Sequence, residues 1–398
     1  MIQIKVVSQQ PSKNFSWAVS DLAYRMYQPS NRQLSSLAFL WPALAAASAS
    51  EVTALIAGQF ASLAVGAGDA AVREPEWATP HTIALELETV RLRDFSTAAD
   101  GVPALLCAPL ALHGAVIADL APGHSLVAAM RQAGLGRLFV AEWRSATPQM
   151  RFLAIDDYLA DLNLLVDELG GIVDLVGLCQ GGWMALVYAA RFPGKVRKLV
   201  LAGAPIDIAA APSALSELAA ATPSGVFREL VRLGDGLLPG HKVAKFWGVE
   251  SVTADDVRQA LQAPAPVGSD DFAALEAVFR EWHAWTIDLS GRFFLEVVDR
   301  LYKRNELAAG AFVALGKRID LATVNVPIFM LAARHDELVA PEQLFASERL
   351  VGTATPDIRK AMVPCCHAAL FMGKTTLEHT WPGIVRWIAK PMPAAAAA

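Results

Sequence analysis

The sequence predicts an α/β protein in which helices cover both faces of a mostly parallel sheet. Short apolar runs alternate with segments whose apolar residues recur at helical spacing. This alternation stops between about residues 206 and 320 and then resumes. Buried strands separated by helices are typical of a parallel sheet covered on both faces. The late insertion is typical of a cap above the carboxyl edge of the sheet, where the clefts of such sheets lie.

The expected elements follow one another regularly. Strand-like alternation begins at Thr82 and continues to Leu92. Further strands are expected at 103–109, 137–141, 172–178, 198–202, 327–332 and 358–363, and helices at 125–134, 156–169, 180–191, 341–350 and 376–388. This order predicts an N-terminal helical region (1–75), a core (76–205 and 321–390), a cap insertion (206–320) and a disordered low-complexity tail (391–398).

The composition excludes several classes of protein. With 54% hydrophobic and 18% charged residues, the 398-residue chain can bury a large core. The net charge of −5 and the absence of a strongly basic stretch argue against a nucleic-acid partner. Four cysteines make no disulfide framework, and the adjacent Cys365 and Cys366 suit neither an ordinary bridge nor a zinc site. We therefore expect no metal and no cofactor.

The first 75 residues show no clear targeting signal. Residues 36–68 are rich in Ala, Leu and Ser, but Glu51 interrupts a stretch that would have to span about 20 apolar residues to cross a membrane. Packed or amphipathic helices are the main interpretation, and adhesion to a lipid or polymer particle is the alternative. Residues 1–32 are mostly polar and do not look like a signal peptide, so a cytoplasmic location is expected.

The most informative motif is GLCQGG at 177–182, which follows an apolar strand and opens a helix. This is the context of a Gly-x-nucleophile-x-Gly elbow, in which side chains at 177 and 181 would collide with neighbouring backbone. Cys179 would then lie at a helix N-terminus, where aligned amide dipoles favour the thiolate. The alternative is a buried structural cysteine followed by packing glycines, and the flanking strand and helix make it the weaker interpretation.

Two later strand ends supply partners for this cysteine. Asp336 follows the strand at 327–332 and is the predicted acid, with Glu337 as the competing candidate. His367 follows the strand at 358–363 and is the predicted base, able to take the thiol proton and return it to a leaving group. The order nucleophile, acid, histidine is that of the α/β-hydrolase fold.

The other site residues come from two segments. The backbone N–H of Gln180, directly after the nucleophile, is expected to form one half of an oxyanion hole. The loop at 108–114 is expected to supply the other half, and Leu110 is the candidate. His113 and Trp183 are candidates for substrate binding, although a lone loop histidine such as His113 is more often simply solvated.

Between Ala104 and Trp387 the sequence resembles polyhydroxyalkanoate synthases and intracellular polyhydroxybutyrate depolymerases. The synthase likeness lies in DLAPGHSLV at 119–127 and in the elbow GLCQGG. The depolymerase likeness lies in APL at 108–110 with His113, GAPID at 203–207, LPGH at 238–241 and HAALFMG at 367–373. Synthases usually place a histidine directly after the catalytic aspartate, where this sequence has Glu337.

The resemblance implies a Cys-Asp-His enzyme acting on 3-hydroxyacyl esters. The main hypothesis is hydrolysis of poly- or oligo(3-hydroxyalkanoate) by water attacking an acyl-cysteine intermediate. The first alternative is a synthase, in which a 3-hydroxyl group intercepts the same intermediate and 3-hydroxyacyl-CoA is polymerised. The second is a non-catalytic protein of the granule surface. The expected partners are a polyester or 3-hydroxyacyl substrate, the polyhydroxyalkanoate granule surface and a second copy of the chain.

Overall fold

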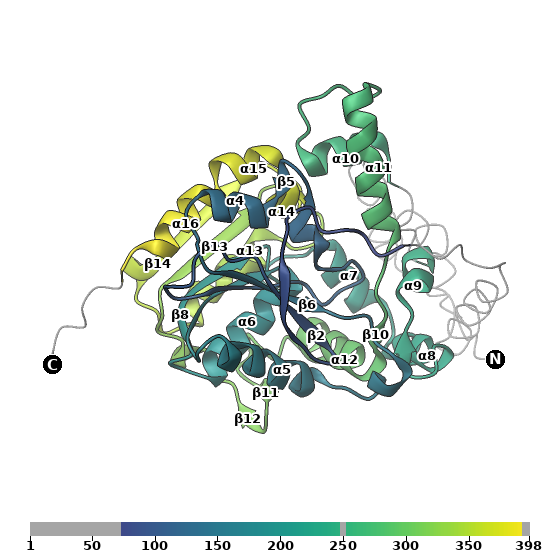
Figure 1. Cartoon of the computed structure of the whole chain (residues 1–398). Coiled ribbons are helices and arrows are strands. Elements are labelled where there is room, and N and C mark those ends of the chain that lie inside the picture. The colour runs from purple at the N-terminus through teal and green to yellow at the C-terminus, as the bar shows by residue number, and fades with distance from the viewer. Residues whose placement is uncertain (1–72, 247–251, 392–398) are drawn as a thin grey trace, which may run out of the picture.

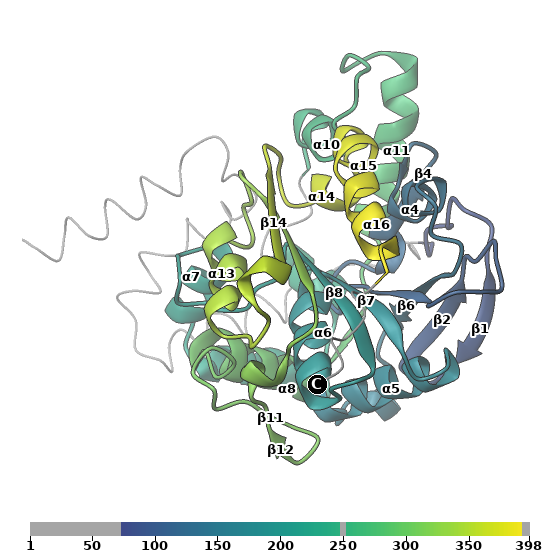
Figure 2. The same ribbon diagram turned by 90° about the vertical axis from the view of Figure 1, so that its left-hand side faces the viewer.

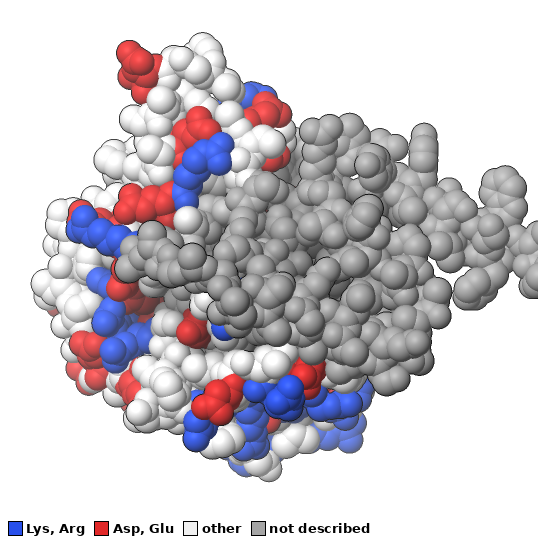
Figure 3. All heavy atoms as spheres, turned by 90° about the vertical axis from the view of Figure 1, so that its right-hand side faces the viewer, with Lys and Arg blue, Asp and Glu red and all other residues white. Residues whose placement is uncertain are grey.

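The computed structural model describes residues 73–246 and 252–391. The expected N-terminal helical region and the expected tail lie almost wholly outside these residues. Within the described ranges, no helix is both long enough and apolar enough to cross a bilayer. On the face drawn in Figure 3, the Lys and Arg side chains of the described part are interspersed with Asp and Glu side chains.

A single large sheet forms the centre of the molecule (Figure 1). Its eight strands lie in the order β1-β2-β6-β3-β7-β8-β13-β14, so that β1 and β14 form its two edges (Figure 2). The pairs β1/β2 and β2/β6 are antiparallel and all the others are parallel. The strands are β1 (Thr82–Glu86), β2 (Val90–Asp94), β3 (Ala104–Cys107), β6 (Leu138–Trp143), β7 (Val173–Leu178), β8 (Val196–Ala202), β13 (Ile328–Ala333) and β14 (Ile358–Val363).

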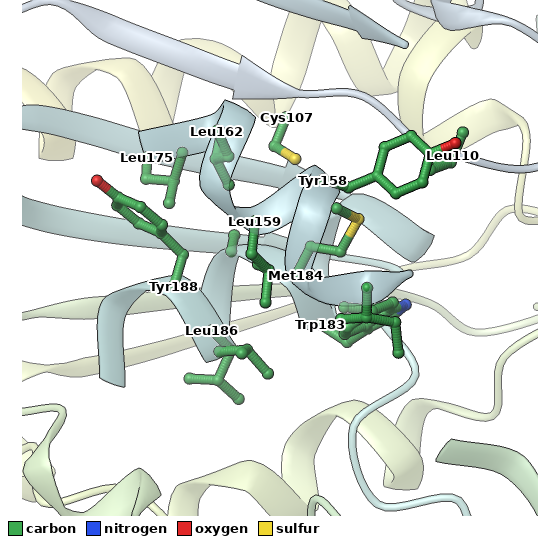
Figure 4. Packing of buried hydrophobic residues seen from close by; sticks show 14 of the residues in the cluster. Cys107, Leu110, Tyr158, Leu159, Leu162, Leu175, Trp183, Met184, Leu186 and Tyr188 are labelled. Atoms are coloured by element: carbon green, nitrogen blue, oxygen red, sulfur yellow. The ribbon is translucent and has the colours of Figure 1, made fainter. Parts of the chain in front are cut away.

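Helices cover both faces of the sheet, which confirms the predicted architecture. Because successive side chains of a strand point to opposite faces, Leu105 and Cys107 belong to one apolar cluster and Ala104 and Leu106 to the other. The first cluster, part of which Figure 4 shows, includes α5 (Ile155–Glu168) and α6 (Gln180–Arg191). The second includes α4 (Leu126–Gln132), α14 (Ala369–Met372) and α16 (Trp381–Ala389).

The segment between β8 and β13 is mostly helical, and we refer to residues 206–320 as the insertion. Its main elements are α7 (Ala214–Ala221), α8 (Ser224–Leu233), α9 (Gly240–Phe246), α10 (Ala254–Leu261), α11 (Asp270–Ala284), α12 (Gly291–Glu296) and the π-helix η4 (Val297–Lys303). Figures 1 and 2 show α10 and α11 beside α14 and α15 (Lys374–His379) at one end of the molecule. The backbone N–H of Ile287 also donates to the carbonyl of Leu112, in the loop after β3 (2.9 Å). The insertion therefore contacts the carboxyl edge of the sheet.

Two expected helices are each divided in the structure. The segment 376–388 contains the end of α15 and most of α16, because Pro382 in the first turn of α16 has no backbone N–H and its ring collides with the preceding turn. The segment 341–350 begins as α13 (Pro341–Phe345) and continues as the 3-10 helix η6 (Ala346–Arg349). By contrast, the helix 180–191 and the strand 358–363 have the expected bounds.

Candidate active site

Cys179 occupies the turn between β7 and α6. Its φ of 50° and ψ of −119° lie in a region that residues with a side chain rarely adopt. The turn is held from the sheet, since the backbone N–H of Cys179 donates to the carbonyl of Ala202 at the end of β8 (2.8 Å). The Cys179 side chain is 8% exposed. The predicted elbow is therefore present, with the thiol at the start of a helix.

Three glycines make this turn sterically allowed. A Cβ at Gly177 would lie 2.5 Å from the Cα of Gly182, and one at Gly181 would lie 2.7 Å from the carbonyl oxygen of Ala108. A Cβ at Gly182 would overlap the methyl group of Ala204. The glycines thus let α6 approach β3 and the chain after β8 closely.

His367 and Asp336 form a buried pair beside this turn. Nδ1 of His367 lies 2.7 Å from Oδ2 of Asp336. The other carboxylate oxygen, Oδ1, accepts the backbone N–H groups of Leu338 (3.0 Å) and Val339 (2.8 Å). The ring fits against Gly203, where φ is +57° and a Cβ would lie 3.0 Å from Cε1 of His367. The carboxylate is thus held rigidly, and its contact with Nδ1 leaves Nε2 as the nitrogen available for proton transfer.

The environment of His367 favours its protonated form. Burial opposes a charge on the ring, but the electrostatic influence of Asp336 and then of Cys179, together with the hydrogen bond to Asp336, raises the pKa of His367 well above its ordinary value. Nε2 of His367 is buried and has no partner at hydrogen-bond distance among the described residues. Cys179 nevertheless influences the ring electrostatically, and these surroundings favour an imidazolium.

Glu337, the competing acid, has a different contact. Its Oε2 accepts the backbone N–H of His367 (3.1 Å) and not a ring nitrogen. Burial raises the pKa of Glu337, and the charge of His367 opposes that shift. Of the two carboxylates, Asp336 is therefore the one in contact with the imidazole.

Gln180 is held by two aromatic side chains. Its Oε1 accepts the indole N–H of Trp183 (2.7 Å), and its Nε2 donates to the hydroxyl of Tyr302 on η4 (2.7 Å). Burial and then the electrostatic influence of Cys179 raise the pKa of Tyr302. The sequence alone did not indicate Tyr302, because no motif surrounds it.

Trp183 lies in a different place from the one expected for a residue that binds substrate. The side chain is 0% exposed and belongs to the apolar cluster on the α5 and α6 face, shown in Figure 4, whereas Cys179 belongs to the cluster on the opposite face. We therefore correct its expected role from contact with substrate to support of the Gln180 side chain. Trp183 can support Gln180 because it lies three residues later on α6, and residues at this spacing lie on the same face of a helix.

The loop after β3 carries the remaining candidates. Leu110 packs its side chain in the cluster that contains Tyr158 (Figure 4), and the role of its backbone N–H remains a prediction. The ring of His113 lies 5.0 Å from that of Trp282 and 4.7 Å from that of His283, measured between centroids. His113 is thus partly covered by α11 of the insertion and is not a solvated loop residue.

The three remaining cysteines differ from Cys179 in their surroundings. Burial raises the pKa of Cys107 and of Cys365 to about 12 and that of Cys366 to about 11. Each is therefore a thiol at neutral pH. Across residues 73–246 and 252–391, no group of three or more His, Cys, Asp or Glu side chains is placed to hold a metal ion.

The fold and the elbow together indicate the class of protein to which the chain belongs. Residues 142–374 match the family model described as alpha/beta hydrolase fold, and the chain belongs to that family. An epoxide hydrolase from Bacillus megaterium has a similar structure, with a TM-score of 0.50 at 15% identity over 76% of this chain and 98% of that one. At this identity, the structural likeness supports the fold alone.

Within the family, the chain is similar to proteins named poly(3-hydroxyalkanoate) polymerase subunit PhaC. The relative from Synechocystis is 26% identical over 68% of this chain and 74% of its own length. The relative from Allochromatium vinosum is 28% identical over 63% and 71%, and that from Haloferax mediterranei is 24% identical over 78% and 64%.

These relatives correct the main functional hypothesis. Six curated relatives match, and all are named as polymerase subunits. Hydrolysis of the polyester as the principal activity is therefore wrong, and the synthase alternative fits better. The segments that resemble depolymerases misled the prediction.

Proposed function

We propose that this protein is an acyltransferase that polymerises 3-hydroxyacyl groups from a coenzyme A thioester through an acyl-Cys179 intermediate. One observation carries the proposal. A cysteine in a strained elbow, with a buried His–Asp pair beside it, occurs in a chain whose curated relatives are all named as polymerase subunits.

The first half of the proposed reaction loads the enzyme. His367 holds the proton of Cys179, and the sulfur attacks the thioester carbonyl. The bond from that carbon to the coenzyme A sulfur breaks, and the leaving thiolate takes the proton from Nε2 of His367. The products are the acyl-Cys179 thioester and free coenzyme A. Asp336 keeps the ring oriented and stabilises its positive charge.

The second half extends the chain. Nε2 of His367 accepts the proton of a 3-hydroxyl group, whose oxygen attacks the acyl-Cys179 carbonyl. A new ester bond forms, the carbon–sulfur bond breaks and the Cys179 sulfur is restored. In both halves, the negative oxygen of the tetrahedral intermediate would be stabilised by the backbone N–H of Gln180, at the start of α6, and by that of Leu110.

Exclusion of water supports transfer over hydrolysis. Cys179 is 8% exposed and His367 is 4% exposed. An acyl-enzyme at such a site meets bulk water rarely, so a bound hydroxyl group can react first. The growing polymer would leave the protein as an apolar chain, so the proposed site of action is the surface of a polyester granule.

The test uses purified protein and 3-hydroxybutyryl-CoA. We expect release of coenzyme A together with polymer, and an acyl group on the peptide that contains Cys179. The Cys179→Ala variant should be folded and inactive. Free 3-hydroxybutyrate as the main product would contradict the proposal, and so would turnover by Cys179→Ala. A non-catalytic granule protein would show neither acylation nor release of coenzyme A.

A further inference from the structure

Two buried polar atoms between the insertion and the sheet lack a hydrogen-bond partner among the described residues. They are Nδ1 of His113, in the loop after β3, and Nε1 of Trp282, on α11. Trp282 is 3% exposed, and the two rings lie 5.0 Å apart at an interplanar angle of 39°. Buried polar groups in folded proteins are nearly always hydrogen-bonded, so two unpaired nitrogen atoms in contacting rings need an explanation.

The two atoms are chemically complementary and yet do not satisfy each other. The indole N–H of Trp282 can only donate. Burial, and then the charge of His283, lower the pKa of His113 to about 3, so the ring is neutral and carries a single N–H. A neutral imidazole has one donor and one acceptor nitrogen, so Nδ1 is one or the other.

A hydroxyl group satisfies both atoms in either tautomer of His113. Its oxygen accepts the indole N–H and its proton is donated to Nδ1 when Nδ1 is an acceptor, and its oxygen accepts from both nitrogens when Nδ1 carries the proton. A carbonyl oxygen satisfies both atoms only in the second case, and an ammonium group satisfies His113 alone in the first. The pair is therefore matched to an alcohol.

The pair lies on the same side of the sheet as the proposed nucleophile. Trp282 and Cys179 belong to one apolar cluster, which also contains Ala108 at the start of the loop that carries His113. The carbonyl of Ala108 in turn borders Gly181, two residues after Cys179. The loop is held to the insertion by the bond from Ile287 to Leu112.

We propose that His113 and Trp282 bind the 3-hydroxyl group of the acyl substrate. This inference rests on the proposed acyl transfer and adds the basis of its selectivity. A straight-chain acyl group would leave both buried atoms unpaired, so the site rejects it. A site built to bond a substrate hydroxyl discriminates strongly against the analogue that lacks it.

The experiment measures binding on the Cys179→Ala protein, so that its outcome does not depend on turnover. Dissociation constants are determined calorimetrically for 3-hydroxybutyryl-CoA and for butyryl-CoA. We expect tighter binding of the hydroxylated thioester. In Trp282→Phe and in His113→Phe, each on the Cys179→Ala background, the preference should fall by about 5- to 10-fold, the effect of one lost hydrogen bond.

Trp77→Phe is the matched control. Nε1 of Trp77 is also buried without a partner among the described residues, but its ring packs against His81 and Phe95. This variant should keep the full preference. Thermal unfolding would verify that all variants are folded. Equal affinities for the two thioesters, or an unchanged preference in both ring variants, would overturn the inference and leave a buried water as the partner of the pair. Failure of the proposed polymerisation would appear separately, as absence of polymer from the unsubstituted protein.

Discussion

The histidine at 367 is hydrogen-bonded to Asp336 and is influenced by Cys179, and this is the residue-scale feature from which the proposed chemistry follows. Asp336 lies against Nδ1, and the charge of Cys179 acts on the ring. Both raise the pKa of His367, so the positive ring is stabilised in the folded protein. The associated stability is fully present below the ordinary pKa of histidine and is lost as the pH rises through the raised pKa of the folded state.

Selective alkylation is the first prediction at this scale. Iodoacetamide at pH 7 should label Cys179 well before the other cysteines, because burial raises the pKa of Cys107 and Cys365 to about 12 and that of Cys366 to about 11. Peptide mass mapping measures the order of labelling. Replacement of His367 by Ala should slow labelling of Cys179 at low pH. Equal labelling of all four thiols would argue against an activated thiolate.

The two neighbouring carboxylates should differ sharply in their effect on turnover. Asp336→Asn should lower kcat by about 10³- to 10⁴-fold, because the amide cannot stabilise the imidazolium. Glu337→Gln should cost about 10-fold or less, since Glu337 contacts only the backbone N–H of His367. Steady-state release of coenzyme A provides the measurement. If Glu337→Gln proved the more damaging change, the assignment of the acid would be reversed.

Tyr302 is expected to act through Gln180. Tyr302→Phe removes the acceptor of the Gln180 Nε2 bond and should lower kcat about 5- to 10-fold with little change in stability. Tyr188→Phe is the matched control, since its hydroxyl bonds to Asn163 on the α5 and α6 face. Equal losses of activity in both variants would indicate a general packing effect and no role for Tyr302 at the site.

At the scale of elements, the elbow depends on how closely α6 approaches β3. The start of α6 lies against the backbone carbonyls at the end of β3, and Gly181 allows this contact. The same closeness brings Ala108, at the start of the loop after β3, against α6 two residues after the nucleophile. The proposed oxyanion hole would use this loop and therefore depends on the short distance between the two backbones.

Gly181→Ala should destabilise the fold by about 1–3 kcal/mol, because its Cβ overlaps carbonyl oxygens that cannot rotate away. Gly383→Ala is the control, as this glycine lies early in α16 and the nearest atom to its Cβ is the end of the Arg386 side chain at 3.9 Å. Alanine there should be neutral or stabilising, by up to about 1 kcal/mol. Urea unfolding of both variants compares them directly, and equal stabilities would show that α6 can shift without cost.

For the whole molecule, the decisive contact is that between the insertion and the carboxyl edge of the sheet. Trp285 packs on Gly114, with ring carbon Cη2 3.1 Å from the position of a Cβ there. The insertion also supplies Tyr302, which bonds to Gln180, and Trp282, which belongs to the apolar cluster that contains Cys179. Access of substrate, water and growing polymer to Cys179 therefore depends on the position of the insertion relative to the sheet.

Gly114→Ala should loosen this contact without unfolding the sheet. The methyl group would displace the Trp285 ring, so limited proteolysis should cut within residues 206–320 faster than in the unsubstituted protein. We also expect more hydrolysis of 3-hydroxybutyryl-CoA relative to polymer, since water gains access. Gly383→Ala should behave as the unsubstituted protein does. Unchanged proteolysis would mean that the insertion is held mainly by other contacts.

Much of the fold could be predicted because it depends on local patterns. Apolar periodicity located the helix 180–191 and the strand 358–363 with the bounds that the structure shows. The glycines of GLCQGG indicated the elbow, because the residues of a tight turn must themselves be small enough to fit it. The division of 376–388 was missed although Pro382 was visible, because the apolar pattern continues across it.

By itself, the sequence determined the α/β order, the elbow and the chain order of cysteine, aspartate and histidine. Only the tertiary structure decided that Asp336 and not Glu337 contacts the imidazole. It also decided that Trp183 is buried and bonds to Gln180, and that Tyr302 bonds to Gln180 from the insertion. The physical reason is distance along the chain. Tyr302 lies 122 residues from Gln180, and no local pattern encodes a contact that forms only when the insertion folds back onto the sheet.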